Sequence, residues 1–191
     1  MRLCAGVAKG EAVPIRPAVM QDAAGIASVH VESWRSSYQG IFPANFLASL
    51  SVERREAYWR QQLALTNSSE HIFVVEDEAG QIVGFASGGP IRDNIDGFDG
   101  ELYLIYLLAS AQGKGYGRGL ITQVARQLKA AGLQAMMLWV LEHNLAGRSF
   151  YEALGGEPLL VTKPFMIEGI ELTEVAYGWR DLNTLMVSGS R

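Results

Sequence analysis

The chain holds one cysteine, Cys4, among its 191 residues, so it cannot form an intramolecular disulfide. Such a composition suits a reducing compartment. Long apolar runs are also missing, since none approaches the roughly 18 residues that indicate a membrane-spanning helix. The apolar stretch at residues 3–8 is too short for the core of a secretory signal. These absences predict a cytoplasmic protein with no membrane partner.

Clusters of lysine and arginine are lacking as well. The formal net charge is −4, from 16 Lys and Arg against 20 Asp and Glu, which argues against nucleic acid as a partner. Histidine is scarce, and His30 and His71 show no metal-ligand spacing, so no metal site is predicted. Apolar residues make up 49% of the chain and charged residues 19%, as in an ordinary globular protein, and the length favours one domain.

Glycine is abundant in the middle of the chain, where residues 112–119 read Gln-Gly-Lys-Gly-Tyr-Gly-Arg-Gly. An apolar run typical of a buried strand, 102–109, precedes them, and an apolar stripe at helical spacing, 120–131, follows. In such a strand-to-helix turn, bare backbone amides and the positive end of the helix dipole attract anions. Glycine lets a phosphate approach the backbone, and Lys114 and Arg118 add positive charge. The turn predicts a pyrophosphate site; the alternative is a flexible loop.

The spacing of these glycines discriminates among phosphate-binding turns. A nucleotide P-loop needs Ser or Thr after its lysine, but Gly115 follows Lys114. The dinucleotide fingerprint G-x-G-x-x-G fails because Arg118 or Leu120 stands at its last position. The pattern that fits is Q-x-x-G-x-G, Gln112–Gly117, directly after a strand. It resembles the coenzyme A motif of the GNAT (GCN5-related) N-acetyltransferase superfamily, and an unrelated phosphate-binding fold is disfavoured.

A second stretch, residues 144–155, is similar to another motif of this superfamily through Asn144, Ala146, Phe150, Tyr151 and Gly155. It departs from that motif at Gly156, where an aromatic residue usually stands. The order of predicted elements also looks like the superfamily's: a strand, two or three helices, a hairpin, a strand, the glycine turn, a helix, a strand, a helix and a closing hairpin.

The resemblance implies an α/β fold of the GNAT type over residues 13–182, as a single domain. We expect a mixed, mostly antiparallel sheet of about seven strands with a central, splayed parallel pair, flanked by about four to five helices. Residues 1–12 and 183–191 are expected to be loose termini.

The resemblance also implies acetyl-CoA as the cosubstrate. Its pantetheine arm would lie between the splayed strands and pair with the main-chain groups of Leu107 and Leu108. Its diphosphate would rest on the glycine turn. The remaining expected cofactor contacts are Gln112, Gly113, Lys114, Gly115, Tyr116, Gly117, Arg118, Asn144 and Tyr151.

Acetyl transfer to an amine needs two proton movements. An amine with a pKa of about 10.4 is protonated at pH 7, and a positioned base lowers the cost of freeing it. Glu101 resembles the glutamate that serves as base in several family members; the alternatives are a solvated strand-end carboxylate, or His143 as the base. Tyr151 matches the family's tyrosine acid, which protonates or hydrogen-bonds the departing thiolate; otherwise it is an aromatic anchor.

The acceptor site is the part about which the sequence says least. Trp34 and Tyr38 share one face of a predicted helix and could wall an acceptor pocket, although such a stripe also suits a core. The loop before the central strand could attract a cationic amine through Asp93, Asp96 and Asp99, or these carboxylates could simply be solvated.

Together these features predict an N-acetyltransferase that moves an acetyl group to the primary amine of a small molecule, an amino acid or a peptide. Attack would be direct in a ternary complex, because Cys4 lies outside the motifs and offers no nucleophile. The alternative is a catalytically weak coenzyme A-binding module that acts as a sensor or regulator. The sequence leaves a homodimer open.

Overall fold

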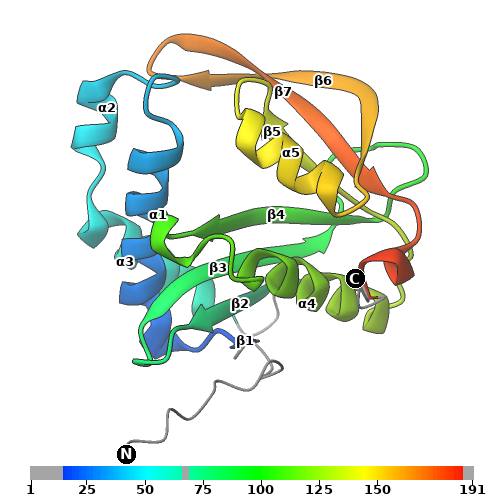
Figure 1. The fold of residues 1–191 in the computed structure, drawn as a ribbon, viewed down its shortest axis with the longest axis horizontal. Helices are drawn as coiled ribbons and strands as arrows, with labels where there is room; N and C mark the ends of the chain where they lie inside the picture. Colours follow the sequence, from blue (N-terminus) through cyan, green and yellow to red (C-terminus); the bar gives the residue numbers. More distant parts are fainter. Residues whose placement is uncertain (1–14, 66–68, 187–191) are drawn as a thin grey trace, which may run out of the picture.

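The computed structural model describes residues 15–65 and 69–186, so the expected loose segment 1–12 lies outside the described residues. A seven-stranded sheet with the order β1-β2-β3-β4-β5-β7-β6 forms its centre (Figure 1). The strands are β1 (Ile15–Pro17), β2 (His71–Glu76), β3 (Ile82–Pro90), β4 (Gly100–Leu107), β5 (Met136–Leu141), β6 (Glu157–Ile167) and β7 (Ile170–Trp179). The α-helices are α1 (Ala23–Ser37), α2 (Ala44–Ser49), α3 (Val52–Leu63), α4 (Tyr116–Ala130) and α5 (Leu145–Ala153).

The sheet has the predicted character, because β4 and β5 run parallel and every other neighbouring pair runs antiparallel. The parallel pair is connected through α4, whose length and position match the apolar stripe after the glycine turn. The expected mixed, mostly antiparallel sheet with a central parallel pair is therefore confirmed. Among the described helices, none combines the length and the apolar character that a membrane span requires.

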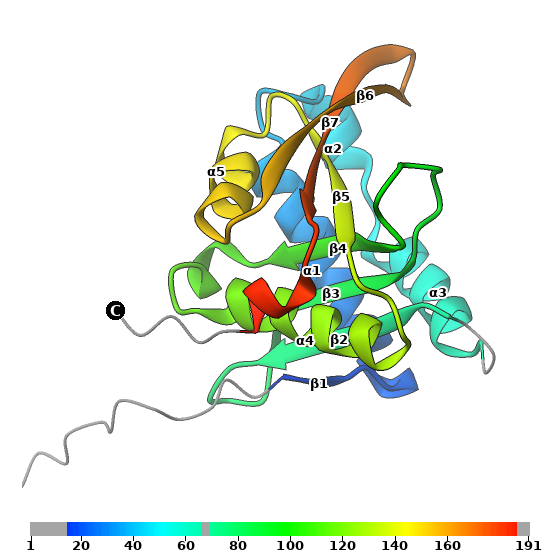
Figure 2. The same ribbon diagram turned by 90° about the vertical axis from the view of Figure 1, so that its right-hand side faces the viewer.

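Helices cover both faces of the sheet (Figures 1 and 2). On one face, α4 and α5 share a core with β2, β4 and β5. The large apolar residues of the α4 stripe, Leu120, Ile121, Val124 and Leu128, are all buried, at roughly 1.5–3 kcal/mol for each side chain. On the other face, α1 and α3 pack on β2 and β3 around the fully buried Trp59 and Phe85. The amphipathic pattern of each helix thus decides which side of the sheet it covers.

The parallel strands part after only two paired residues. Gly100 lies opposite Met136 and Glu101 opposite Met137, after which β4 follows β3 while β5 follows β7. A register shift between β3 and β4 at Ser87 increases the bend, as β-bulges do. This divergence is the expected splay, and it leaves one edge of β4 without a neighbouring strand beyond Glu101.

The C-terminal segment differs from expectation. Residues 182–185 form a 3-10 turn, Leu185 is 4% exposed within the core, and Thr122 Oγ1 donates a hydrogen bond to its carbonyl at 2.9 Å. The prediction of a loose terminus from residue 183 is therefore wrong for residues 183–186, because the two leucines of this turn pack under α4. Residues 187–191 lie outside the described part of the chain.

Candidate functional site

The glycine turn needs glycine at two positions for backbone reasons. Gly113 has φ +74° and Gly115, the N-cap of α4, has φ +84°, a region that costs other residues energy. A Cβ placed on either glycine would meet nothing within 4 Å, so the space beside the turn is open. The helix begins at Tyr116, four residues earlier than the apolar stripe suggested, and the second half of the glycine stretch is its first turn.

The start of α4 presents unpaired amides. The first intrahelical hydrogen bond runs from Gly119 N to Gly115 O at 3.0 Å. The three amides before it, of residues 116–118, have no acceptor within the helix, as at every helix N-terminus. The side chains of Lys114 and Arg118 are exposed beside them. Dipole, amides and cations therefore converge on one open site suited to a phosphate.

Gly117 serves a different purpose from the one expected. It is buried, and a Cβ there would meet Phe150 Cζ at 3.0 Å and Leu107 Cδ1 at 3.1 Å. Its missing side chain therefore allows α4 to approach α5 and β4, rather than clearing space for a phosphate. The Gly117 amide is still one of the three main-chain amides at the start of α4 that have no acceptor within the helix.

The exposed edge of β4 presents Leu107 but not Leu108. The Leu108 amide donates to Val83 O at 2.9 Å and the Leu108 carbonyl accepts from Ala111 N at 2.9 Å, so its expected role as a main-chain contact is wrong. In an antiparallel pair, alternate residues direct their main-chain N–H and C=O groups toward the partner strand and away from it. The main-chain groups of Leu107 and Ile105 therefore point away from β3, toward the gap that β5 leaves. Ile105 was missed, although counting two residues back from Leu107 would have found it.

Helix α5 brings the second motif to the same gap. Asn144 caps the helix, with its Oδ1 accepting from Gly147 N at 3.0 Å, and its amide nitrogen can donate to another partner. Tyr151 is 8% exposed and packs against Phe150 and Trp179. Burial, and then the nearby Tyr38, raise the pKa of Tyr151, so its phenol carries a proton at neutral pH.

Aromatic rings line the opposite side of β4. Trp34 and Tyr38 touch with ring centroids 5.2 Å apart, and His30 stacks on Tyr106 at 4.9 Å. Burial raises the pKa of Tyr38 and that of Tyr106. For Tyr38, the interaction with the Tyr106 hydroxyl offsets part of this rise. Burial, aided by Arg55, lowers the pKa of His30 to about 3, so its ring is neutral. Within the described residues, Trp34 Nε1 is a buried donor without a hydrogen-bond partner.

Glu101 does not fit the role of base. Its carboxylate is 1% exposed and accepts from Arg92 through the amide at 3.0 Å, through Nε at 3.1 Å and through Nη2. To take up a proton, this buried carboxylate would have to give up its bidentate ion pair with Arg92, whose own side chain is 59% exposed. His143, the other candidate, is exposed in the turn after β5. Burial and pairing of this kind cannot be read from a strand-end glutamate in a sequence.

The aspartates of the loop before β4 are also occupied. Asp99 accepts from the amides of residues 134 and 135 at 2.9–3.0 Å and so joins the loop to the start of β5. Asp93 accepts from Trp139 Nε1 at 2.8 Å and from Lys163 Nζ at 2.8 Å. Asp96 is exposed. For Asp93 and Asp99 the idea of free carboxylates that attract a cation is therefore wrong.

The structure reveals one further carboxylate, Glu174, that the sequence did not single out. It stands on β7 opposite Leu141, at the end of β5 where the gap is widest, and its side chain is 17% exposed. Burial raises the pKa of Glu174, and Lys163 Nζ at 3.9 Å opposes that effect. The charge of Glu174 adds to the raised pKa of Tyr38, after the larger effect of burial. The sequence contains many glutamates, and only the position of Glu174 in the fold distinguishes it from the others.

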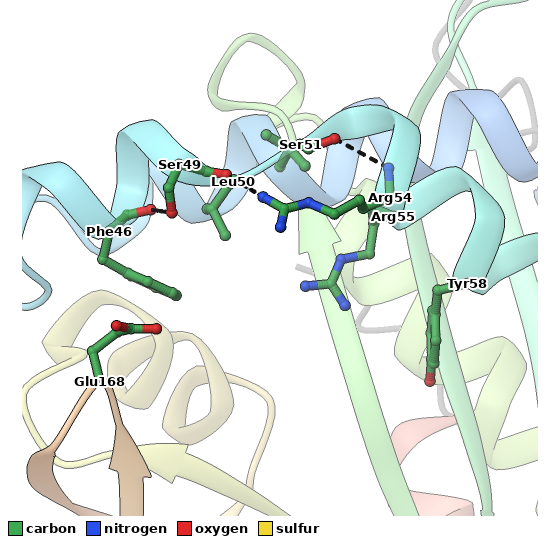
Figure 3. Close-up of a pocket in the computed structure, with 9 residues that line it drawn as sticks. Phe46, Ser49, Leu50, Ser51, Arg54, Arg55, Tyr58 and Glu168 are labelled. Carbon is green, nitrogen blue, oxygen red and sulfur yellow. Dashed lines mark hydrogen bonds between the residues drawn. The ribbon is translucent and has the colours of Figure 1, made fainter.

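A pocket of about 350 Å³ lies between α2, α3 and the turn that joins β6 to β7 (Figure 3). Phe46 of α2 and Glu168 from the β6–β7 turn lie on one side of it, and Arg54, Arg55 and Tyr58 of α3 on the other. Trp34 and Tyr38 do not line it, although the Trp34 ring touches Phe46 with centroids 6.2 Å apart.

Comparison with known proteins gives matches over most of the chain. A family model described as "Acetyltransferase (GNAT) family" matches residues 31–156. The uncharacterized N-acetyltransferase YuaI of Bacillus subtilis is 42% identical over 173 residues, 91% of this chain and 96% of that protein.

Two solved structures with a bound cosubstrate have a similar fold. PaiA N-acetyltransferase of Thermoplasma acidophilum, in complex with coenzyme A, superposes with a TM-score of 0.65 at 21% identity, over 86% of this chain and 98% of that one. A phosphinothricin acetyltransferase of Sinorhizobium meliloti, in complex with AcCoA, does so with a TM-score of 0.66 at 22% identity, over 87% of each chain.

Proposed function

The chain belongs to the acetyltransferase (GNAT) family, and on this premise we propose that it acetylates the primary amine of a small molecule, an amino acid or a peptide. It is an N-acetyltransferase whose acetyl donor is acetyl-CoA. The observation that carries the proposal is the gap between β4 and β5, which has an anion site at the start of α4, after β4, and a carboxylate, Glu174, on β7 opposite the last residue of β5. A cytoplasmic location and the option of a homodimer remain predictions from the sequence.

The residues present fit this donor. The open space beside Gly113 and Gly115 and the amides of residues 116–118 suit a diphosphate, with Lys114 and Arg118 beside them. In our proposal the main-chain groups at the free edge of β4 pair with the amide-containing arm, as a missing strand would. The remaining expected contacts, Gln112 and the Asn144 amide nitrogen, complete the cofactor site.

The acetyl thioester supplies the electrophilic carbonyl, and the chain supplies the proton transfers. We assign the base to Glu174, because it is a carboxylate at the wide end of the gap that is not held in a bidentate ion pair. Its pKa lies above the ordinary value, so it is a better proton acceptor than a solvated glutamate. It receives the proton of the acceptor ammonium, directly or through one water.

Tyr151 serves the second proton movement, the one toward the departing sulfur. Its hydroxyl stays protonated because the ring is buried, and it donates a hydrogen bond to the sulfur that leaves as a thiolate. A phenol with a raised pKa gives up its proton less readily than a thiol does, so stabilisation by a hydrogen bond describes the step better than full transfer. A main-chain amide at the free edge of β4 would stabilise the developing oxyanion.

Release of free thiol from acetyl-CoA, measured across a panel of primary amines, tests the proposal. We expect amine-dependent thiol release well above hydrolysis, with formation of the N-acetyl product confirmed by mass spectrometry. Saturable acetyl-CoA binding without turnover of any amine would instead favour the alternative, a coenzyme A-binding sensor or regulator.

A further inference from the structure

Lys163 of β6 lies between two carboxylates. Strand pairing places it directly opposite Glu174 of β7. Side chains of such a cross-strand pair can interact directly, because their Cβ atoms are only about 4.5–5.5 Å apart. The Lys163 ammonium nevertheless lies 3.9 Å from Glu174 Oε2 and 2.8 Å from Asp93 Oδ2, in the loop before β4. Its shorter ion pair is therefore with a residue of another segment and not with its cross-strand neighbour.

Asp93 and Lys163 are both held by the same indole. Trp139 of β5 donates from Nε1 to Asp93 Oδ2 at 2.8 Å. The Lys163 ammonium lies over the Trp139 ring, 4.4 Å from its centroid, where the face of the indole attracts a cation. Side chains from β5, from β6 and from the loop thus fix the ammonium on the Asp93 side.

The loop that carries Asp93 is attached to the sheet on both sides of this residue. Arg92, the preceding residue, forms a bidentate ion pair with Glu101 of β4. Phe98, farther along the loop, is buried against β5 and β7. Asp93 therefore cannot follow Lys163 toward Glu174 unless these contacts break. It is a fixed partner for a flexible lysine side chain.

The position of Lys163 matters for the protonation of Glu174. The groups whose charges influence the pKa of Glu174 are Lys163 on β6, Arg92 and Asp93 in the loop and Glu101 on β4, and Tyr38 at the end of α1 is influenced by Glu174. After burial, which raises this pKa, Lys163 has the largest effect and lowers it. A closer approach of the ammonium would lower the pKa of Glu174 further and would occupy its carboxylate.

We propose that Asp93 is a positioning residue for the reaction: it holds the Lys163 ammonium away from Glu174, so that the Glu174 carboxylate can accept the proton of the acceptor amine. This inference rests on the proposed function, in which Glu174 is the base. Asp93 does not touch the reacting atoms in this arrangement, and it acts only through Lys163.

The test is the pH profile of kcat/KM from thiol release for Asp93→Asn, Lys163→Met and the combined variant. Asp93→Asn keeps the size of the side chain and removes the charge that holds Lys163. If the ammonium then moves from 3.9 Å to about 2.8 Å from Glu174, Coulomb's law gives a pKa decrease of about 0.3 unit in water and about 1 unit near a protein surface. The ionised base is the active form, so the acidic limb should move to lower pH by this amount. Turnover at pH 7 should fall by about threefold or more, because a less basic carboxylate bound to lysine accepts a proton poorly.

The combined variant separates positioning from other roles of Asp93. In the Lys163→Met background no ammonium is released, so Asp93→Asn should have little further effect, and removal of Lys163 should restore the turnover that Asp93→Asn loses. A purely structural role of Asp93 in the loop would not be rescued by removal of its own partner. A direct charge effect of Asp93 would shift the acidic limb equally in both backgrounds. Either of these two results would overturn the inference.

A control and a substitute variant complete the experiment. Asp96→Asn removes the same charge from an exposed position in the same loop and should leave the acidic limb in place. If Asp93→Asn does not fold, Trp139→Phe takes its place, because it removes the donor to Asp93 and keeps an aromatic ring beside Lys163. A limb that moves to lower pH would then support the inference, and an unmoved limb would refute it.

If no amine is acetylated, the proposed function fails, and the placement of Lys163 is decided without turnover. The measurement is an NMR titration of the ¹³C-labelled Glu174 carboxylate in the coenzyme A complex. Asp93→Asn should lower the pKa of Glu174 when Lys163 is present and leave it nearly unchanged in the Lys163→Met background. Equal pKa values of Glu174 in the wild type and in Asp93→Asn would show that Asp93 does not hold the lysine away.

Discussion

Exchange of Glu174 for glutamine removes a proton acceptor while keeping the size and shape of the side chain. At pH 7, freeing the lone pair of an amine with a pKa of about 10.4 costs roughly 4–5 kcal/mol, and a positioned base typically contributes a factor of about 10² to 10⁴. We therefore expect Glu174→Gln to lower kcat by about a hundredfold or more at pH 7. The deficit should shrink above about pH 10, where the amine deprotonates unaided.

The neighbours of Glu174 predict how its pH dependence responds to a second change. The charged groups that influence its pKa are Lys163 on β6, Arg92 and Asp93 in the loop before β4, and Glu101 on β4, and its own charge influences Tyr38 at the end of α1. Burial raises its pKa and Lys163 lowers it. The ionised base is the active form, so activity falls as the pH drops through this pKa. Replacing Lys163 must therefore move the acidic limb to higher pH.

The distance indicates the size of this shift. Unit charges 4 Å apart interact by about 1 kcal/mol in water and about 4 kcal/mol near a protein surface, and one pKa unit corresponds to about 1.4 kcal/mol. Lys163 Nζ lies 3.9 Å from Glu174 and the lysine side chain is 35% exposed, so the lower end applies. We expect Lys163→Met to raise the acidic-limb pKa by about one unit.

The assay is the pH profile of kcat/KM from thiol release, recorded for both variants. Glu171→Gln is the control, because Glu171 lies on the same strand and is exposed. An acidic limb that stays in place in Lys163→Met, together with near-normal turnover by Glu174→Gln, would refute the assignment. The base would then have to be sought on another element.

Three further predictions concern the remaining site residues. Tyr151→Phe should lower kcat by about tenfold to a hundredfold with little change in the Kd for acetyl-CoA, and unchanged turnover would exclude the hydroxyl from the reaction. Gly117→Val should cost about 1–3 kcal/mol in urea unfolding, because its Cβ would stand 3.0 Å from Phe150; full stability would show that the helix contact yields. Glu101→Gln should destabilise the fold by about 1–3 kcal/mol, less than for a fully buried pair, because the Arg92 side chain is 59% exposed. It should leave the acidic limb of the pH profile in place. Loss of that limb would instead identify Glu101 as the base.

The fold could be predicted almost entirely from local patterns. The apolar stripe of α4, the caps at Ser51 and Asn144, and the glycines at positive φ each act over a few residues, so the sequence displays them directly. The adjacency of β4 and β5 follows from the short parallel crossover through α4, whereas the position of β7 between β5 and β6 does not. Errors arose where a partner distant in sequence decided the outcome, as when Leu185 packed into the core.

The candidate site likewise has one part that local sequence patterns predict and another that depends on contacts between distant segments. Gln112–Gly117 and residues 144–155 resemble two motifs of the family, and this resemblance indicated the donor from the sequence alone. We propose that main-chain amides at the start of α4 bind the donor, and glycine spacing marks where that helix starts. The acceptor side depends on side chains that strand pairing brings together: Arg92 neutralises Glu101, and Leu141 positions Glu174. Charge and burial at a site are sums over contacts between remote segments. For this reason the sequence indicated the acetyl donor, and only the tertiary structure showed that Arg92 pairs closely with Glu101 whereas Glu174 has a lysine no nearer than 3.9 Å.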